Sequence, residues 1–403
     1  MAVRLAECAA VAALFICRVT DWGFRYYGLA LILIAQLAAS VWRAVRGGGA
    51  RTGGGVVRRV VVPLVLLAVA AIPAIVFPQY EPIPVTGEYK VANTVYHFVD
   101  HSRIETYSGG GGGPRALAVE FWYPEAVGGA GGDGGERPLI VFSHGAFGIR
   151  SSNETLFREL ASHGYVVCSI DHTYQCLYTR ARDGKIRWMD SGYAREIRSE
   201  DAKKDKLASL ELYRKWMGIR VADIDFVIDE VAARAGAGAE AGDQPFGMVD
   251  PSHIGVMGHS LGGSAALGIG RLRDDVDAVV ALEAPFLCDI VAVRDGAFEF
   301  LSSDYPVPVL NIYSDSSWDH LDEWPQYEEN ARLLAAADGA DTSVYNLHIA
   351  GAGHLTFTDL SLSSPILTRI LNGHATSISA RECLDLINRE CLAFLDRCVQ
   401  TAR

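Results

Sequence analysis

The chain has 403 residues, of which 50% are hydrophobic and 21% are charged, with a net charge of −12. This length suits one large domain with an additional segment, and the hydrophobic content excludes disorder over most of the chain. The charge is unevenly distributed, because residues 1–80 carry a net +6 and the remaining 323 residues a net −18. An acidic body without a stripe of lysine and arginine argues against nucleic acid as a partner.

Residues 1–80 contain three apolar stretches that we interpret as membrane-associated helices. Val60–Phe77 has eighteen residues without a charge, which as a helix nearly cross a hydrocarbon core about 30 Å thick. Tyr26–Trp42 is also uncharged and has aromatic residues at its ends, as is typical of the headgroup region. Leu5–Cys17 is shorter and includes Glu7, so it is predicted as a third span, an interfacial helix or part of a signal. We therefore predict a transmembrane region of two to three helices, with a buried helical hairpin of a soluble protein as the alternative.

Arginine placement predicts how this region crosses the membrane. The loop between the second and third apolar stretches carries Arg43, Arg46, Arg51, Arg58 and Arg59. Because cytoplasmic loops carry an excess of positive charge, this loop is placed in the cytoplasm. The third stretch then runs outward, so the chain after about residue 78 is expected outside the cytoplasm. The sequence thus predicts a multi-pass protein of the cell membrane with an extracytoplasmic body.

Residues 81–90 are predicted to be a proline-rich, extended linker. In residues 91–403, apolar runs of strand length alternate with helical segments, among them Leu207–Ala233 and a helix that starts at Leu261. This alternation predicts a doubly wound, mostly parallel α/β sheet, with the polar segment 173–206 as an excursion over its carboxyl edge. The predicted strands are Val91–Val99, Ala116–Tyr123, Leu139–Phe142, Tyr165–Ile170, His253–Met257, Ala278–Leu282, Val307–Tyr313 and Tyr345–Ile349.

One G-x-S-x-G motif, Gly258–Gly262, predicts a nucleophilic serine. It follows an apolar run directly and precedes a helix of small residues, which is the strand–turn–helix context that presents a serine at a sharp turn. The two glycines are needed because backbones approach too closely there for side chains. Ser260 is therefore the predicted nucleophile, and a glycine-rich loop with an incidental serine is the alternative.

A serine needs a base to remove its proton, and the base needs a third group to orient it. His354 is the predicted base, because it alone follows the last strand in a glycine-containing turn. His348 lies inside a predicted strand, and His320 follows another strand. His259 neighbours the nucleophile, and its ring is expected to point away. These three histidines are predicted to be structural.

Two carboxylates are candidates for the acid of the triad. Glu283 directly follows the strand after the serine motif, and Asp315 follows the next strand. A carboxylate at the end of an uninterrupted apolar strand is costly without a partner, whereas Asp315 lies in a serine-rich, solvated turn. We therefore favour Glu283 and keep Asp315 as the alternative.

Two backbone amides are predicted to form the oxyanion hole. One belongs to Leu261, the residue after the nucleophile, and the other lies in the loop after the strand at 139–142. Ala146 is the favoured donor in that loop, with Gly145 as its neighbour.

These segments together resemble the secreted, lipoprotein-associated type of platelet-activating factor acetylhydrolase, a family of the α/β-hydrolase superfamily. The resemblance covers about residues 90–400, in matching order and spacing, and its most specific part begins at His354. Its segments are Ser143–Gly148, Gly258–Gly263, Leu282–Ala284 and His354–Asp359. It implies an α/β-hydrolase fold and an acid on the strand after the elbow strand, which supports Glu283.

The resemblance also implies a serine esterase that needs neither calcium nor another cofactor and cleaves short or oxidised acyl chains from phospholipids. The expected partners are an ester substrate and the lipid bilayer, with Phe147 and Phe286 as substrate-contacting side chains. The acid is Glu where the family usually has Asp, and the apolar N-terminal region suggests a membrane-anchored bacterial relative. A general esterase or lipase, a polyester hydrolase, an acyltransferase with the same triad and a membrane-tethered binding protein are the alternatives.

The cysteines leave two interpretations open. Disulfides in an oxidising compartment and buried thiols both fit the six cysteines that follow residue 80. No C-x-x-C spacing is present, so no metal site is expected. The six are Cys168, Cys176, Cys288, Cys383, Cys391 and Cys398.

Overall fold

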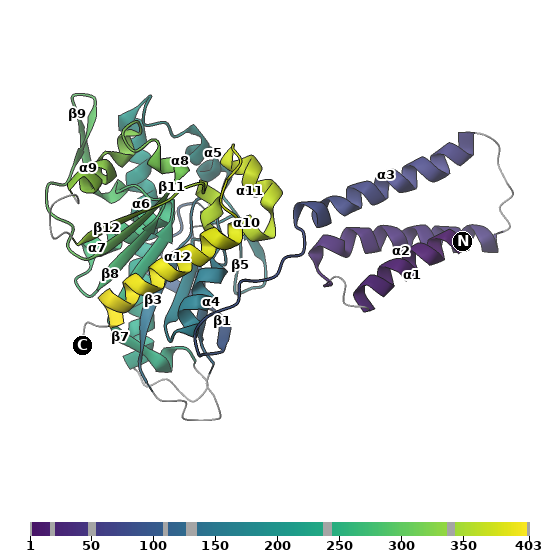
Figure 1. Ribbon diagram of the computed structural model, residues 1–403, viewed down its shortest axis with the longest axis horizontal. Helices are drawn as coiled ribbons and strands as arrows, with labels where there is room; N and C mark the ends of the chain where they lie inside the picture. Colours follow the sequence, from purple (N-terminus) through teal and green to yellow (C-terminus); the bar gives the residue numbers. More distant parts are fainter. Residues whose placement is uncertain are drawn as a thin grey trace. The chain divides into compact units, whose positions relative to one another are not determined.

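The computed structural model of the chain describes residues 2–16, 21–46, 54–107, 112–125, 135–236, 244–336 and 343–400. These residues form two compact units (Figure 1). The first comprises Met1–Pro82 with Leu360–Leu371, and the second comprises Ile83–Asp359 with Asn372–Arg403.

The first unit is helical. Its three N-terminal helices coincide with the three apolar stretches: α1 (Ala2–Ile16), α2 (Phe24–Val45) and α3 (Gly54–Val76). The unit also includes the segment with the short helices α10 (Leu360–Ser363) and α11 (Pro365–Asn372). Among the described residues, one helix is long and apolar enough to cross a membrane, at Phe24–Trp42, and only 6% of that segment is buried. The third stretch contributes a shorter apolar helix, Val61–Val76, so a span is supported for the second stretch alone.

The second unit is built around an eight-stranded sheet with the order β1-β2-β4-β3-β7-β8-β11-β12. The pairs β1–β2 and β2–β4 are antiparallel, and the strands from β4 to β12 are parallel. The mostly parallel, doubly wound sheet predicted from the sequence is therefore confirmed. The strands are β1 (Val91–Ile104), β2 (Pro114–Pro124), β3 (Arg137–Ser143), β4 (Val166–Asp171), β7 (Val249–His259), β8 (Ala278–Leu282), β11 (Val309–Ser314) and β12 (Val344–Ile349).

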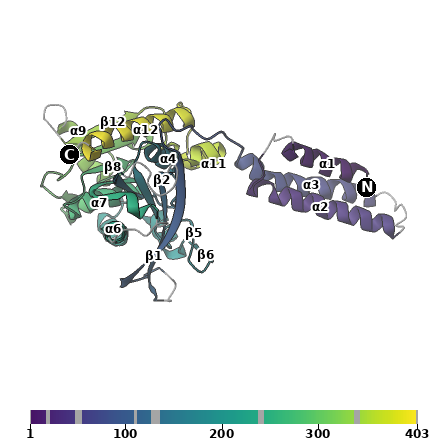
Figure 2. The same cartoon turned by 90° about the horizontal axis from the view of Figure 1, so that it is seen from below.

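Burial explains why the central strands have continuous apolar sequences. Every residue of β4, β8 and β11 is buried, since helices cover both faces of a parallel sheet. Figure 2 shows α4 (Glu154–Ser162) and α12 (Ala380–Leu395) on one face. It shows α6 (Lys206–Gly236) and α7 (Leu261–Leu272) on the other.

The excursion at 173–206 contains a short ribbon and a helix, and other small elements were not anticipated from the sequence. The ribbon pairs β5 (Tyr178–Arg180) with β6 (Ile186–Trp188), and α5 (Ser191–Ser199) follows it. A hairpin of β9 (Ile290–Arg294) and β10 (Ala297–Phe300) lies between β8 and β11, and α8 (Asp315–Trp318) and α9 (Glu328–Ala336) lie between β11 and β12. The remaining turns are the 3₁₀ segments Phe246–Met248, Leu287–Asp289, Pro325–Tyr327 and His354–Phe357, and the π-helical segment Asp396–Gln400.

All six cysteines that follow residue 80 are free thiols. Cys168, Cys176, Cys383 and Cys391 are buried, and burial raises the pKa of each of these thiols. A buried, protonated thiol packs as a small apolar group. The structure therefore corresponds to the buried-thiol interpretation.

Candidate functional site

Ser260 lies at the sharp turn between β7 and α7. Its backbone is in a left-handed conformation, with φ 53° and ψ −124°. Such a conformation is strained for a residue with a side chain and persists only where the surrounding structure imposes it. Here the Ser260 amide donates a hydrogen bond to the carbonyl of Leu282 at the end of the neighbouring strand β8 (2.8 Å).

Two glycines make this turn sterically possible. A Cβ atom added at Gly258 would lie 2.3 Å from the carbonyl carbon of Gly262. A Cβ atom added at Gly262 would lie 2.0 Å from the carbonyl oxygen of Ser143. Both distances are far below van der Waals contact, so only glycine fits, as the sequence motif predicts.

Glu283 directly follows β8, and its carboxylate reaches His354. Glu283 is 1% exposed, and its backbone is left-handed, with φ 56°. Its Oε2 lies 3.3 Å from Nδ1 of His354. Its Oε1 accepts hydrogen bonds from the Ser317 hydroxyl (2.9 Å) and from the Ser314 amide. The buried carboxylate is thus hydrogen-bonded on both oxygens.

Asp315, the alternative acid, lies in a different environment. Its Oδ1 is 2.8 Å from Nε2 of His348, and its Oδ2 accepts a hydrogen bond from the Gly351 amide (2.9 Å). These contacts hold the glycine-containing turn that precedes His354. The structure therefore brings Glu283 to His354 and gives Asp315 a supporting position.

His259 lies against His354, contrary to the expectation that its ring points away. The two ring centroids are 4.6 Å apart. Nε2 of His259 donates to the backbone carbonyl of His354 (3.1 Å). Burial, and to a lesser extent the neighbouring His354, lower the pKa of His259 well below its usual value, so this ring stays neutral. It fixes the backbone of the His354 turn.

The two predicted oxyanion donors lie beside Ser260. Leu261 is the first residue of α7, so its amide has no acceptor within the helix. The loop after β3 forms a turn in which the Gly148 amide donates to the Gly145 carbonyl (3.1 Å), with Phe147 at φ 61°. Ala146 is the first central residue of this turn, a position whose amide takes no part in the turn hydrogen bond.

These residues line one cavity of about 300 Å³, together with aromatic side chains that the sequence analysis did not identify. Trp216 and Tyr213 come from α6, and Trp324 and Tyr327 from the segment before α9. They lie 44 to 67 residues from Ser260 in the chain, and no local motif marks them. The predicted residues in the lining are Ala146, Ser260, Leu261, Glu283 and His354.

Phe147 and Phe286 do not belong to this lining. Phe147 is 37% exposed, with Arg198 over its ring at 5.8 Å. Phe286 is 1% exposed and packs on Tyr305 in the core, with ring centroids 5.7 Å apart. The chain turns the Phe286 side chain inward, and Pro285 and Leu287 line the cavity instead.

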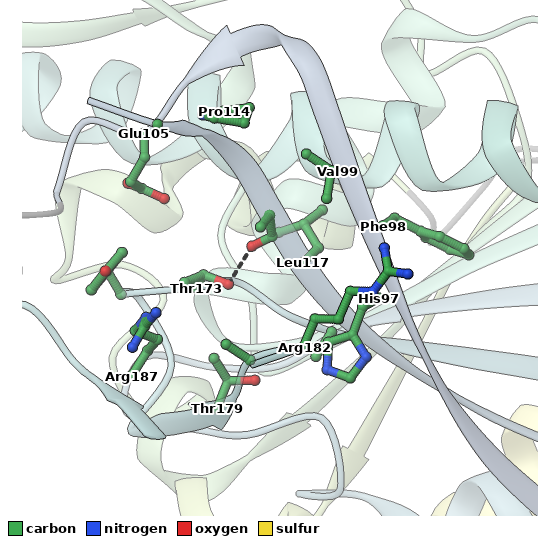
Figure 3. A pocket seen from close by; sticks show the side chains of 15 residues that line it. His97, Phe98, Val99, Glu105, Pro114, Leu117, Thr173, Thr179, Arg182 and Arg187 are labelled. Carbon is green, nitrogen blue, oxygen red and sulfur yellow. Dashed lines mark hydrogen bonds between the residues drawn. The ribbon is translucent and has the colours of Figure 1, made fainter. Parts of the chain in front are cut away.

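A second cavity, of about 400 Å³, lies between the β1–β2 pair and the β5–β6 ribbon (Figure 3). Its wall includes Leu117, Thr173 and Thr179, with Arg182 and Arg187 from the excursion. It is larger than the cavity at Ser260, but none of the predicted catalytic residues lines it. Chemistry therefore favours the smaller cavity as the candidate active site.

A second serine–histidine–acid arrangement lies beneath the loop after β3. The Ser143 hydroxyl is 2.8 Å from Nε2 of His172, and Nδ1 of His172 is 2.9 Å from Oδ2 of Asp223. All three side chains are 0% exposed, so no substrate can reach them. Burial lowers the pKa of His172 to about 4, with the nearby Arg220 acting in the same direction. This arrangement is structural, whereas Ser260 opens into a cavity.

One group in the described part of the chain has the composition of a metal site. The ligand atoms of His144, Asp171 and Cys176 lie within 4.8 Å of one another. However, Asp171 pairs with Arg150 and accepts a hydrogen bond from the Thr179 hydroxyl (2.6 Å). Burial raises the pKa of the Cys176 thiol well above its usual value. The possible metal ligands of this group are thus already hydrogen-bonded or protonated, and the group does not fit a metal ion.

Asp359 connects the segment after His354 to the start of α4. Its Oδ2 accepts a hydrogen bond from the Thr155 amide (2.8 Å), and its own amide donates to the Ser152 carbonyl (2.9 Å). Burial raises the pKa of Asp359 to about 7, and nearby Glu154 adds to this rise. Oδ1 has no hydrogen-bond partner in the part of the chain that the structure describes. Ionisation of this carboxyl therefore disfavours the folded state.

We expect the wild-type protein to lose stability as the pH rises from 5 to 8, and we predict that Asp359→Asn abolishes this loss. The pKa of about 7 in the folded chain exceeds the unfolded value of about 3.9, so the folded state binds more protons in this window and loses stability as the pH rises. Thermal unfolding of both proteins should show the variant gaining several degrees on the wild type from pH 5 to pH 8. A constant difference in Tm across this range would contradict the assignment.

Comparison with known proteins gives a family match over more than half of the chain. The family model described as "Platelet-activating factor acetylhydrolase, isoform II" matches residues 127–185 and 243–402. A platelet-activating factor acetylhydrolase of Canis lupus familiaris is 24% identical over an alignment of 288 residues, and the match covers 66% of this chain and 57% of that protein. The protein of the same name from Gallus gallus is 25% identical over an alignment of 280 residues, and the match covers 66% of this chain and 62% of that protein. The chain thus spans less than two thirds of the length of these relatives.

Among solved structures, the fold is similar to that of a ferulic acid esterase from Streptomyces cinnamoneus. The TM-score is 0.56 at 22% sequence identity, and the match covers 79% of this chain and 92% of the other. At this identity the similarity concerns the fold, which is the α/β-hydrolase arrangement predicted from the sequence.

Proposed function

The chain belongs to the family of platelet-activating factor acetylhydrolase, isoform II, and from this premise we propose that it is a serine carboxylic-ester hydrolase. Ser260 is the nucleophile, His354 the general base and Glu283 the acid. One observation carries the proposal: the strained Ser260, the imidazole of His354 and the oxyanion donors share one cavity, with Glu283 bonded to His354 at 3.3 Å.

The proposed reaction is acyl transfer in two steps. The Ser260 Oγ attacks the ester carbonyl while Nε2 of His354 takes its proton, and Glu283 stabilises the imidazolium through Nδ1–H. The Leu261 and Ala146 amides bind the carbonyl oxygen as it becomes negative. His354 then protonates the departing alcohol. In the second step, a water molecule deprotonated by His354 attacks the acyl-enzyme, which releases the acid and restores Ser260.

The longer side chain of Glu283 fits this role because of its backbone. The side chain of aspartate is one methylene shorter, so the backbone of an aspartate would have to lie closer to the imidazole of His354. Glu283 leaves β8 in a left-handed conformation and directs its carboxylate toward the serines of the turn after β11. Two donors there hold Oε1, which leaves Oε2 for His354.

We further propose that the substrate carries a short or oxidised acyl chain, as on a phospholipid. Support comes from the names of the relatives and from the cavity volume of about 300 Å³, which is at the lower end for ligand sites. A general esterase, a polyester hydrolase or an acyltransferase would use the same triad. Product analysis with and without an added alcohol separates hydrolysis from transfer.

The N-terminal region is proposed to hold this domain at the membrane. The apolar helix at Phe24–Trp42 supports a membrane segment. The five arginines between residues 43 and 59 favour a cytoplasmic position for the loop that follows it, and thus an extracytoplasmic position for the domain if α3 also crosses. A multi-pass arrangement of this kind would tether the domain to a bilayer that contains lipid esters.

Replacing Ser260 tests the nucleophile. Ser260→Ala should reduce hydrolysis of p-nitrophenyl acetate by several orders of magnitude and abolish labelling by a fluorophosphonate, because the attacking oxygen is missing. Ser143→Ala, which alters the buried arrangement, should still be labelled, and peptide mapping should locate the label at Ser260. Full activity of Ser260→Ala would refute the proposal.

The two acids can be compared directly. Glu283→Gln should lower kcat by about 10³-fold or more, because the amide cannot stabilise the imidazolium. Asp315→Asn should lower kcat by less than about tenfold, since the carbonyl of Asn can still accept from the Gly351 amide. Steady-state kinetics with p-nitrophenyl acetate provide both values. A larger effect of Asp315→Asn would move the acid to the end of β11.

Topology can be tested in intact cells. A membrane-impermeant fluorophosphonate should label the protein in intact cells of a single-membrane host as strongly as after permeabilisation. Ser260→Ala should remove the signal in both samples. Labelling that requires permeabilisation would place the domain in the cytoplasm.

A further inference from the structure

Arg220 is a fully buried cation beneath the loop that carries one of the proposed oxyanion donors. It lies in the middle of α6 and is 0% exposed. Its Nη1 donates a hydrogen bond to the backbone carbonyl of His144 (2.5 Å). Its Nε donates to Oε1 of Gln175 (2.9 Å), and its Nη2 to the Tyr193 hydroxyl (3.4 Å). One guanidinium thus joins α6, the excursion and the loop after β3.

Within the described ranges, no direct ion pair balances the charge of Arg220. Every acceptor that its guanidinium reaches in the described residues is uncharged. Asp223, one turn later on α6, is bonded instead to Arg115 (2.6 Å) and to His172 (2.9 Å). A buried cation without a carboxylate partner is costly for folding. Its position therefore calls for an explanation other than stability.

The loop that Arg220 contacts has little stiffness of its own. Gly145 and Gly148 flank Ala146 and Phe147, and the one backbone hydrogen bond recorded within the turn joins these two glycines. Glycine allows many backbone conformations, so the direction of the Ala146 amide depends on anchors outside the turn. The carbonyl of His144, directly before Gly145, is such an anchor, because it is held by Arg220.

The buried arrangement of Ser143, His172 and Asp223 supports the same loop from the adjacent position. Ser143 precedes His144, and its hydroxyl lies between Nε2 of His172 (2.8 Å) and Nη1 of Arg220 (3.5 Å). The His172 amide in turn donates to Nε2 of His144 (3.4 Å). Both residues that lead into the oxyanion turn are therefore fixed by side chains that are themselves buried and hydrogen-bonded.

We propose that Arg220 is a positioning residue of the esterase reaction, which aims the Ala146 amide at the oxyanion by anchoring the carbonyl of His144. This inference rests on the proposed function. The guanidinium also places positive charge behind the loop, where it favours negative charge developing on the carbonyl oxygen. Its contribution is made in the transition state, so loss of Arg220 changes kcat and leaves substrate binding almost unchanged.

Arg220→Gln tests this role. It should lower kcat for p-nitrophenyl acetate by about 100-fold, the scale of losing one oxyanion donor, with KM within about twofold. The rate of fluorophosphonate labelling at Ser260 should fall in parallel, because the phosphoryl oxygen occupies the same hole. Arg220→Lys, which can donate to the His144 carbonyl but not to all partners, should recover part of the loss.

Arg271→Gln is the matched control. Arg271 lies at the far end of α7 from Ser260 and pairs with Asp289 (2.7 Å). Its loss should lower Tm but leave kcat within about twofold of the wild type. If Arg220→Gln lowers kcat no more than Arg271→Gln does, or raises KM as much as it lowers kcat, the positioning role is refuted. Absence of any label at Ser260 in the wild type would instead refute the proposed function.

Gln175→Met keeps the test decisive if Arg220→Gln does not fold. This change removes the acceptor that holds Nε of Arg220 and nearly preserves the side-chain volume. It should lower kcat by about tenfold with KM unchanged, since the guanidinium loses one of its fixed contacts. Unchanged kcat in the folded Gln175→Met protein would refute the proposal.

Discussion

The close approach of backbone segments at the turn between β7 and α7 is the constraint on which the candidate site depends. Gly258 lies against Gly262, and Gly262 lies against the carbonyl of Ser143 at the end of β3. This contact forces Ser260 into its strained conformation and brings it beside the loop that begins at His144. Main-chain packing thus brings the Ser260 turn and the loop after β3 together.

The carboxylates of the site divide into two roles because of where their strands end. Glu283 follows β8 directly and is buried. Ser314 at the end of β11 and Ser317 in α8 hold one of its oxygens, and His354 contacts the other. Asp315, at the end of β11, binds the turn before His354 through Gly351. One acid contacts the imidazole, and the other holds the backbone that carries it.

Sequence patterns predicted much of this arrangement. All eight strands of the sheet were predicted. The continuous apolar runs of β4, β8 and β11 reflect burial on both faces. Ser260 and Glu283 were proposed because each directly follows a strand, and His354 because it lies in the glycine-containing turn after the last strand. Parallel strands end at one edge of the sheet, so these residues were expected to lie together. The N-terminal apolar stretches were recognised as helices, although one of them alone, at Phe24–Trp42, has the length and composition of a membrane span among the described residues.

The sequence by itself determined the sheet and the glycine-flanked turn at Ser260, and it predicted the order of the proposed triad, since these depend on local patterns of apolar residues and glycine. Only the tertiary structure decided the aromatic wall of the cavity, the inward turn of Phe286 and the contact of His259 with His354. It also decided the anchoring of His144 by Arg220, 76 residues away in the chain. Such contacts depend on how α6 packs beneath the sheet edge, and no local period or motif encodes them.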